Sequence, residues 1–239
     1  MEIKEFSKKM INAANKINIV LNQNQINQFY DYMNLLIDWN EKINLTAITE
    51  PDDVIVKHFI DSLTIAEDIV ENSRLIDIGT GAGFPGIPLK IYNSSLNITL
   101  LDSLNKRTIF LNEVIKKLSL KNVEVIHGRA EDFAQNLKYR ECFDYAVSRA
   151  VAPLNILLEY LVPYIKVGGK VIAMKGSNAE EEIKFSKNAL QKLETSISKN
   201  KKIELPNNSG ERYILIMKKN KKTNKIYPRK AGTPKKNPL

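Results

Sequence analysis

A glycine-rich turn within residues 74–90 constrains the fold of this chain more than any other feature. The segment reads Arg-Leu-Ile-Asp-Ile-Gly-Thr-Gly-Ala-Gly-Phe-Pro-Gly-Ile-Pro-Leu-Lys. Gly79, Gly81 and Gly83 can adopt backbone angles closed to other residues, and they let a ligand lie against the main chain. A strand, a glycine turn and a helix in this order build the nucleotide pocket of α/β folds. A cofactor site is therefore expected here, and a purely structural turn is the alternative.

The spacing of the glycines fits two kinds of cofactor. Residues 81–86 match the Gly-x-Gly-x-x-Gly pattern of dinucleotide sites. Residues 77–83 match the acidic-x-Gly-x-Gly-x-Gly turn typical of S-adenosylmethionine-dependent methyltransferases. A pyrophosphate needs bare N–H groups at a helix N-terminus, and Pro85 and Pro88 remove two of them. The ammonium and sulfonium of S-adenosylmethionine suit the carboxylate of Asp77, so the methyl donor is favoured.

Segments typical of strands alternate with segments typical of helices along most of the chain. Five strands are expected near residues 74–78, 97–102, 123–127, 143–148 and 169–175. Each is followed by an expected helix, near 86–93, 104–119, 130–137, 153–164 and 178–195. Two further strands without a helix between them are predicted to pair antiparallel, near 201–206 and 211–217. Helices are expected before the first strand, near 2–20, 23–42 and 51–70.

This order of elements predicts an α/β fold, a doubly wound Rossmann-like sheet with a C-terminal β-hairpin and an N-terminal helical cap. The expected divisions are a cap over residues 1–70, a methyltransferase domain over 71–217 and a basic tail over 218–239. No apolar run approaches the roughly 18 residues of a membrane helix, and the N-terminus lacks the apolar core of a signal peptide. The single cysteine, Cys142, excludes an internal disulfide and has no metal-ligand spacing. A cytoplasmic monomer without a metal is expected.

The net charge of +9 comes entirely from the C-terminus. Residues 218–239 contain nine Lys and Arg and no acidic residue, whereas the rest of the chain balances 27 basic against 27 acidic residues. Such a segment predicts an arm that binds a polyanion, with RNA favoured. Tyr227 and the sequence Pro-Arg-Lys-Ala-Gly-Thr-Pro at 228–234 indicate an ordered, extended segment. A solvated tail that only aids solubility is the alternative.

Further candidate residues follow the strands at the edge that carries the glycine turn. Asp102, at the end of the second strand, is expected to hold the ribose hydroxyls of the cofactor. Ala130 and Glu131 follow the third strand and are expected beside the adenine, with an ordinary turn as the alternative. Arg149 follows the fourth strand and is expected to face the pocket, where it contacts either the cofactor carboxylate or the target nucleotide.

Two absences narrow the reaction. Residues 148–153 lack the Asn/Asp-Pro-Pro-aromatic clamp that grips an exocyclic nitrogen, and Cys142 lacks the setting of a nucleophile for pyrimidine carbons. A ring nitrogen with a free lone pair, such as guanine N7, needs neither device, because it attacks the methyl group directly and loses no proton. Orientation of the reactants, worth about 7–11 kcal/mol at its upper end, then suffices without a catalytic side chain. His58 is expected either to pack or to contact substrate, and His127 to be structural.

Seven motifs occur in one order along the chain: Asn40–Thr46, His58–Leu63, Asp77–Gly86, Asp102–Arg107, Gly128–Glu131, Ser148–Ala150 and Tyr227–Pro234. Together they resemble the bacterial 16S ribosomal RNA guanine-N7 methyltransferases, also called glucose-inhibited division protein B. The resemblance implies a Rossmann-like fold, S-adenosylmethionine as methyl donor, and methylation of one guanine in the decoding region of the small ribosomal subunit. In that family, loss of the N7-methyl group accompanies low-level streptomycin resistance.

The resemblance also implies a cofactor site lined by Gly79, Phe84, Ala130, Glu131 and Arg149. Asp77, Gly81 and Asp102 join this site on the chemical argument above. Gly86 and Ala231 stand where relatives carry other small residues or proline, and neither affects the assignment.

The expected partner is 16S rRNA or the small ribosomal subunit, and the candidate RNA contacts are Lys106, Arg107, Lys175, Arg229 and Lys230. Each lysine has an ordinary surface charge as its alternative. Three other functions stay open at this point. A small-molecule methyltransferase leaves the basic tail without a purpose, a nicotinamide-dependent oxidoreductase lacks an evident proton donor, and a non-enzymatic RNA-binding protein does not need the cofactor turn.

Overall fold

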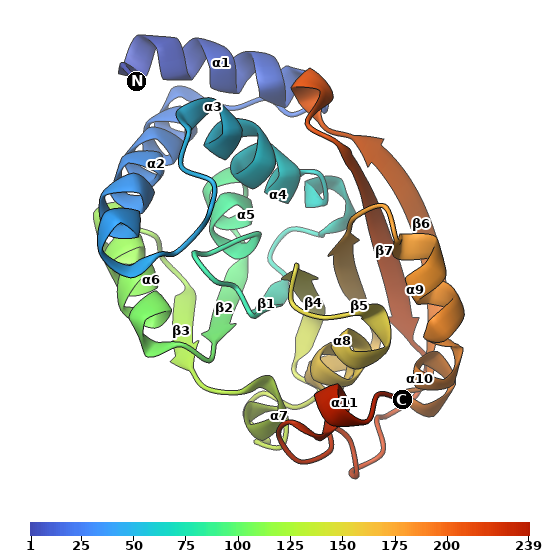
Figure 1. The fold of residues 1–239 in the computed structure, drawn as a ribbon. Coiled ribbons are helices and arrows are strands. Elements are labelled where there is room, and N and C mark those ends of the chain that lie inside the picture. The colour runs from blue at the N-terminus through green and yellow to red at the C-terminus, as the bar shows by residue number, and fades with distance from the viewer.

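Seven strands form one sheet in the order β3-β2-β1-β4-β5-β7-β6 (Figure 1). The computed structural model describes all residues, 1–239. The strands are β1 (Arg74–Ile78), β2 (Asn97–Asp102), β3 (Val123–His127), β4 (Phe143–Arg149), β5 (Ile165–Lys175), β6 (Thr195–Glu204) and β7 (Glu211–Lys219). The first five run parallel, and β7 lies antiparallel between β5 and β6. The predicted doubly wound sheet with an antiparallel terminal pair is confirmed. Its strand order reverses between β1 and β4, where such sheets bind ligands.

Both faces of the sheet are covered, because the central strands are apolar on both sides. Along β1, Leu75 belongs to one cluster of buried side chains and Ile76 to the other, since successive side chains point to opposite faces. The helices whose side chains join the first cluster are α1 (Ile3–Asn15), α2 (Gln23–Ile43), α5 (Gly86–Tyr92) and α6 (Asn105–Lys117). Those that join the second are α8 (Leu154–Leu161), α9 (Ala179–Phe185) and α10 (Lys187–Lys192), and Ala134 joins it directly after α7 (Ala130–Phe133).

The segment before β1 differs from the single helix that the sequence predicts. It consists of α3 (Pro51–Asp53), a π-helix (Val54–Ile60), α4 (Asp61–Leu63) and a 3-10 turn (Ala66–Asp68). Six of the seven π-helical residues are buried, so tertiary packing surrounds most of the segment. The wider winding of a π-helix is common at functional sites, and here the π-helix carries His58 and ends immediately before Asp61.

Several expected boundaries of helices and strands were wrong. The helix expected over 130–137 ends at Phe133, and the helix expected over 178–195 is divided at Ser186, whose hydroxyl donates to the Glu182 carbonyl at 2.6 Å. β5 begins at Ile165 because the glycines at 168–169 form an irregularity in its pairing with β4 and do not end the strand.

The C-terminal segment packs against the body of the protein. β7 continues through Lys219, whose side chain is fully buried. After β7 the chain turns and leads to the short helix α11 (Thr233–Lys236), which contacts α8 and lies next to the C-terminus (Figure 1). Tyr227 and Pro234 are buried on this path, so the expected ordered segment is present. None of the helices combines the length and apolar character needed to span a bilayer.

Candidate cofactor and substrate site

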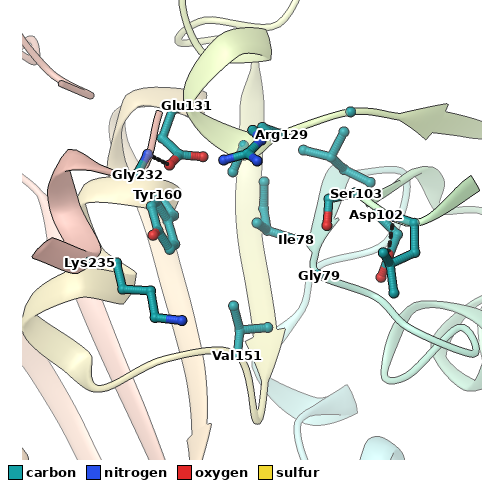
Figure 2. Close-up of a pocket in the computed structure, with 14 residues that line it drawn as sticks. Ile78, Gly79, Asp102, Ser103, Arg129, Glu131, Val151, Tyr160, Gly232 and Lys235 are labelled. Atoms are coloured by element: carbon teal, nitrogen blue, oxygen red, sulfur yellow. Dashed lines mark hydrogen bonds between the residues drawn. The ribbon is translucent and has the colours of Figure 1, made fainter. Parts of the chain in front are cut away.

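Two adjoining cavities open at the carboxyl edge of the parallel strands. The first, of about 390 Å³, lies at the ends of β1, β2 and β3 and is called the β1–β3 cavity here (Figure 2). The second, of about 710 Å³, is lined by the glycine turn, the π-helix and Arg149, and is called the Arg149 cavity. Gly79 and Val151 line both. The two cavities therefore meet at the glycine turn, where a reactant in one would face a reactant in the other.

The backbone of the turn adopts left-handed conformations, with φ of 68° at Gly79 and 62° at Gly81. A Cβ atom on Gly79 would lie 2.5 Å from Cγ2 of Val151, whereas one on Gly81 would meet nothing within 4 Å. Gly79 is thus required both for its conformation and for its close contact. On the other side, the Tyr32 hydroxyl of α2 donates to the Ala82 carbonyl and ties the N-terminal helices to the turn.

Asp77 lies behind the turn and lines neither cavity. Its Oδ2 accepts hydrogen bonds from the Thr80 hydroxyl at 2.7 Å and from the Gly86 N–H at 2.8 Å. Burial raises the pKa of this carboxyl to about 7, although both hydrogen bonds act in the opposite direction. The structure thus places Asp77 where it holds the turn in shape, and the direct contact with a cationic cofactor that the sequence suggested is not formed by this arrangement.

Asp102 and Glu131 bring two carboxylates into the β1–β3 cavity. Asp102 accepts hydrogen bonds from the N–H groups of Gly81 at 2.8 Å and Leu104 at 2.9 Å, and its Oδ2 lies 3.3 Å from Arg107. It is therefore held rigidly at the end of β2. Glu131 accepts a hydrogen bond from the N–H of Gly232 at 2.9 Å, which joins the wall of the cavity to the C-terminal segment.

A stack of three side chains forms one side of the Arg149 cavity. The His58 ring lies parallel to the Phe84 ring, 4.3 Å between centroids, and the guanidinium carbon of Arg149 lies 5.1 Å from the Phe84 centroid. Arg149 Nη2 donates to His58 Nδ1 at 3.2 Å, and His58 Nε2 lies 2.9 Å from the Thr46 hydroxyl. Because a guanidinium can only donate, this geometry assigns the ring proton to Nε2. Burial, together with the charge of Arg149, lowers the pKa of His58 to about 3, so the ring is neutral.

Asp61 holds two arginines from distant parts of the chain. Its Oδ2 lies 2.9 Å from Nη1 of Arg149 and 3.2 Å from Nε of Arg212 at the start of β7. Neither Asp61 nor Arg212 was predicted from the sequence as a site residue. Asp61 was expected in a helix and Arg212 in a strand. The two residues are 151 positions apart in the sequence, so only the folded protein brings them together.

The comparisons with known proteins agree with this geometry. Residues 25–224 match the family described as rRNA small subunit methyltransferase G. A ribosomal RNA small subunit methyltransferase G of Desulforamulus reducens is 50% identical over 229 residues, which cover 95% of each chain. One from Clostridium botulinum is 49% identical over 237 residues, covering 98% of this chain and 99% of that protein. Among solved structures, a SAM dependent methyltransferase from Aquifex aeolicus is similar in fold, with a TM-score of 0.54 at 18% identity over 77% of this chain and 98% of that one.

The chain belongs to the rRNA small subunit methyltransferase G family. It is an enzyme, a methyltransferase, and S-adenosylmethionine is its methyl donor. This decides between the two cofactors that the glycine spacing allowed, and the nicotinamide alternative is wrong. The resemblance that the seven motifs carry is confirmed.

The β1–β3 cavity fits the adenosine part of this donor. An adenosine combines an apolar ring with hydroxyl and amino donors. The cavity combines apolar walls, from Ile78, Leu101 and Leu104, with the carboxylates of Asp102 and Glu131. Of the expected cofactor residues, Gly79, Asp102, Ala130 and Glu131 line this cavity. Phe84, Gly81 and Arg149 line the adjoining Arg149 cavity.

The candidate RNA contacts fall into two groups. Lys106 and Lys230 are exposed, although Lys106 Nζ donates to the Ile43 carbonyl at 2.7 Å, and Arg107 lines the Arg149 cavity. Lys175 and Arg229 are committed to contacts within the protein. Lys175 donates to the Ala152 carbonyl at 2.5 Å and lies 2.7 Å from Glu182, and Arg229 pairs with Glu159 at 2.7 Å. Their roles in RNA binding stay predictions, and the structure gives both an internal partner that an RNA phosphate would have to replace.

Proposed function

We propose that this enzyme transfers the methyl group of S-adenosylmethionine to N7 of one guanine in 16S rRNA, in the decoding region of the small ribosomal subunit. The observation that carries the proposal is the Arg149 cavity. It adjoins the β1–β3 cavity at Gly79 and has room for a nucleotide, and each side chain in it that could act as a base, His58, Asp61 or Glu182, contacts an arginine or a lysine. The names of the relatives supply the small subunit rRNA as substrate.

The chain's own residues bind and orient the donor. Asp102 is suited to the ribose hydroxyls and Glu131 to the amino group of adenine, while the glycine turn lies beside both cavities. When bound, S-adenosylmethionine supplies an electrophilic methyl group. Phe84, with His58 stacked on it, presents an apolar surface on the side of the Arg149 cavity, which excludes water from that side of the reaction.

No group in the Arg149 cavity has to remove a proton. His58 has one ring nitrogen occupied by Arg149 and the other by Thr46, and its low pKa keeps it neutral. Such a histidine is a positioning residue and a poor base. Guanine N7 needs no base, since it has a lone pair and no hydrogen. Catalysis by orientation alone, worth up to about 7–11 kcal/mol, matches this arrangement.

The charge of the Arg149 cavity suits an RNA backbone. It is lined by five basic side chains, Lys57, Arg107, Arg149, Lys175 and Arg212, and by only two acidic ones, Asp61 and Glu182. Exposed tail lysines, including Lys222, Lys225 and Lys230, add further positive charge. Phosphate contacts of this kind supply affinity, and the target base has to leave its stack to reach the methyl group.

The proposal includes a cytoplasmic monomer, as the sequence suggests.

The test is transfer of labelled methyl groups from S-adenosylmethionine to three substrates: small ribosomal subunits from cells lacking this protein, the 16S rRNA extracted from them, and transfer RNA. We expect label in the subunit or in its extracted RNA, recovered as 7-methylguanosine after digestion, and none in transfer RNA. Label in another methylated nucleoside would contradict the N7 assignment. Efficient transfer to small molecules of a cell extract, without transfer to ribosomal RNA, would favour the small-molecule alternative.

A further inference from the structure

The C-terminal segment, residues 223–239, forms part of the wall of the β1–β3 cavity. Gly232 and Lys235 line this cavity together with Tyr160 of α8 and the ends of β1, β2 and β3. Figure 2 shows the Lys235 side chain beside Tyr160 and Gly232 next to Glu131, on the side opposite Asp102. The wall that faces Asp102 is thus supplied by the last residues of the chain.

Arg229 docks this segment on a buried carboxylate. Glu159 of α8 is 0% exposed and accepts hydrogen bonds from the Arg229 backbone N–H at 2.8 Å, from Nε at 2.9 Å and from Nη2 at 2.7 Å. Arg229 Nη2 also donates to the Asn237 carbonyl at 2.8 Å, which fixes the chain on both sides of α11. A buried charge needs such a partner, because a lone carboxylate in an apolar interior is strongly destabilising.

Two helices beside the cavity, α7 and α8, therefore hold the C-terminal segment through hydrogen bonds. Glu131, a candidate for contact with adenine, bonds the N–H of Gly232 through Oε1. Glu159 is the chain neighbour of Tyr160, so the residue that holds Arg229 and the residue that lines the cavity share one turn of α8.

Further contacts secure the approach to this site. The Arg140 guanidinium donates to the carbonyls of Thr223, Asn224 and Tyr227 at 2.8–3.2 Å. Gln135 donates to the Pro228 carbonyl at 2.9 Å. The segment is thus held at several points between Thr223 and Asn237, chiefly through its backbone.

We propose that residues 223–239 belong to the cofactor site, with Gly232 and Lys235 as its wall and Arg229 as the residue that positions them. Docking of the segment and binding of S-adenosylmethionine then stabilise each other, and the coupling is reciprocal. The inference rests on the assignment of the β1–β3 cavity to the adenosine part of the donor. It gives the basic C-terminus a role in cofactor binding besides its proposed role in RNA binding.

Limited digestion of the full-length protein with trypsin tests the coupling without any mutation. Lys225 and Lys230 are exposed cleavage sites within the segment. We expect saturating S-adenosylhomocysteine, the product of the methyl donor, to slow cleavage after Lys230 by about tenfold. Cleavage after the exposed Lys8, on α1, serves as the reference and should not change. Equal rates after Lys230 with and without S-adenosylhomocysteine would overturn the inference.

A matched pair of variants tests the wall itself. Lys235→Ala alters a cavity residue, whereas Lys236→Ala removes the next lysine of the same short helix, which does not line the cavity. We expect Lys235→Ala to raise the dissociation constant for S-adenosylhomocysteine severalfold in calorimetric titration, and Lys236→Ala to leave it unchanged. Equal effects of the two would contradict the inference.

The double variant Arg229→Gln with Glu159→Gln tests the docking pair and avoids leaving a buried charge unpaired. We expect it to weaken S-adenosylhomocysteine binding and to speed cleavage after Lys230. Unchanged binding in this variant would overturn the positioning role of Arg229. Asp102→Asn, on the opposite wall of the cavity, tests the assignment of the β1–β3 cavity separately from the role of the C-terminal segment. If it leaves binding unchanged, the cavity assignment fails; if it weakens binding while the C-terminal variants do not, only the C-terminal inference fails.

Discussion

Individual side chains in this enzyme act mainly by holding other groups in place. Asp77 holds the glycine turn from behind, and Asp61 holds Arg149 and Arg212 together. His58 is fixed between Arg149 and Thr46 while its ring covers Phe84. None of them is arranged to move a proton, which agrees with a reaction at a ring nitrogen that carries none.

The two glycines of the turn give a matched pair of substitutions. Alanine at either Gly79 or Gly81 adopts a left-handed conformation that costs about 1–2 kcal/mol. Gly79→Ala also drives a methyl group into Val151, which adds about 1–3 kcal/mol. We expect Gly79→Ala to lower the free energy of unfolding and the affinity for S-adenosylmethionine more than Gly81→Ala does. Chemical denaturation and calorimetric titration check this, and equal effects would show that the Val151 contact is unimportant.

The neutral His58 predicts a loss of stability in acid. Its pKa is about 3 in the folded protein and 6.5 when free, so the unfolded chain binds more protons between these values. The contribution of the neutral His58 to the free energy of unfolding is complete above pH 6.5. It is lost as the pH falls toward 3, and the loss is at most ~5 kcal/mol.

Urea unfolding at several pH values measures this effect in the wild type and in His58→Gln, which cannot titrate. We expect the wild type to lose more stability than the variant between pH 6.5 and 4. Asp77 titrates in both proteins, so its opposite pH dependence cancels in the comparison. Parallel curves for the two proteins would contradict the assigned state of His58.

At the scale of elements, sequence patterns located the sheet well. The expected ranges of β1, β2 and β3 match the structure, and the antiparallel β6–β7 pair is present, although β6 begins at Thr195 and not near residue 201 as expected. The π-helix at Val54–Ile60 could not be predicted, because its hydrogen-bond register depends on the apolar side chains that surround it. Tyr160 and Lys235 were also missed as cavity residues, since their place depends on how α8 and the C-terminal segment meet. The Pro-Arg-Lys-Ala-Gly-Thr-Pro sequence at residues 228–234 was the one signal for Lys235. It indicated that the segment is ordered but not where the segment packs.

The exposed tail lysines carry the prediction for RNA binding. Replacing Lys222, Lys225 and Lys230 with glutamine removes three charges without touching the contacts of Arg229. If each meets a phosphate, the slope of log affinity against log salt should fall by about 2, since each contact to single-stranded RNA contributes ~0.7. Filter binding of 16S rRNA at several salt concentrations measures the slope, and S-adenosylhomocysteine affinity should stay the same. An unchanged slope would contradict a role for these lysines.

In the whole molecule, the N-terminal helices, the sheet and the C-terminal segment meet around the glycine turn. α2 reaches the turn through Tyr32, the π-helix supplies His58, α4 supplies Asp61, and the C-terminal segment lines the β1–β3 cavity. The two cavities then lie on either side of Gly79, one suited to the methyl donor and the other to a nucleotide. This arrangement agrees with the proposal that the methyl group is directed to one ring nitrogen without a general base.

The most direct test of that account is strand scission at 7-methylguanosine, which reduction and aniline treatment produce, in 16S rRNA from cells with and without this enzyme. We predict one cleavage in the decoding region that is present in the first RNA and absent from the second. Cleavage at that position in both samples, or in neither, would contradict the proposal that this enzyme methylates guanine N7.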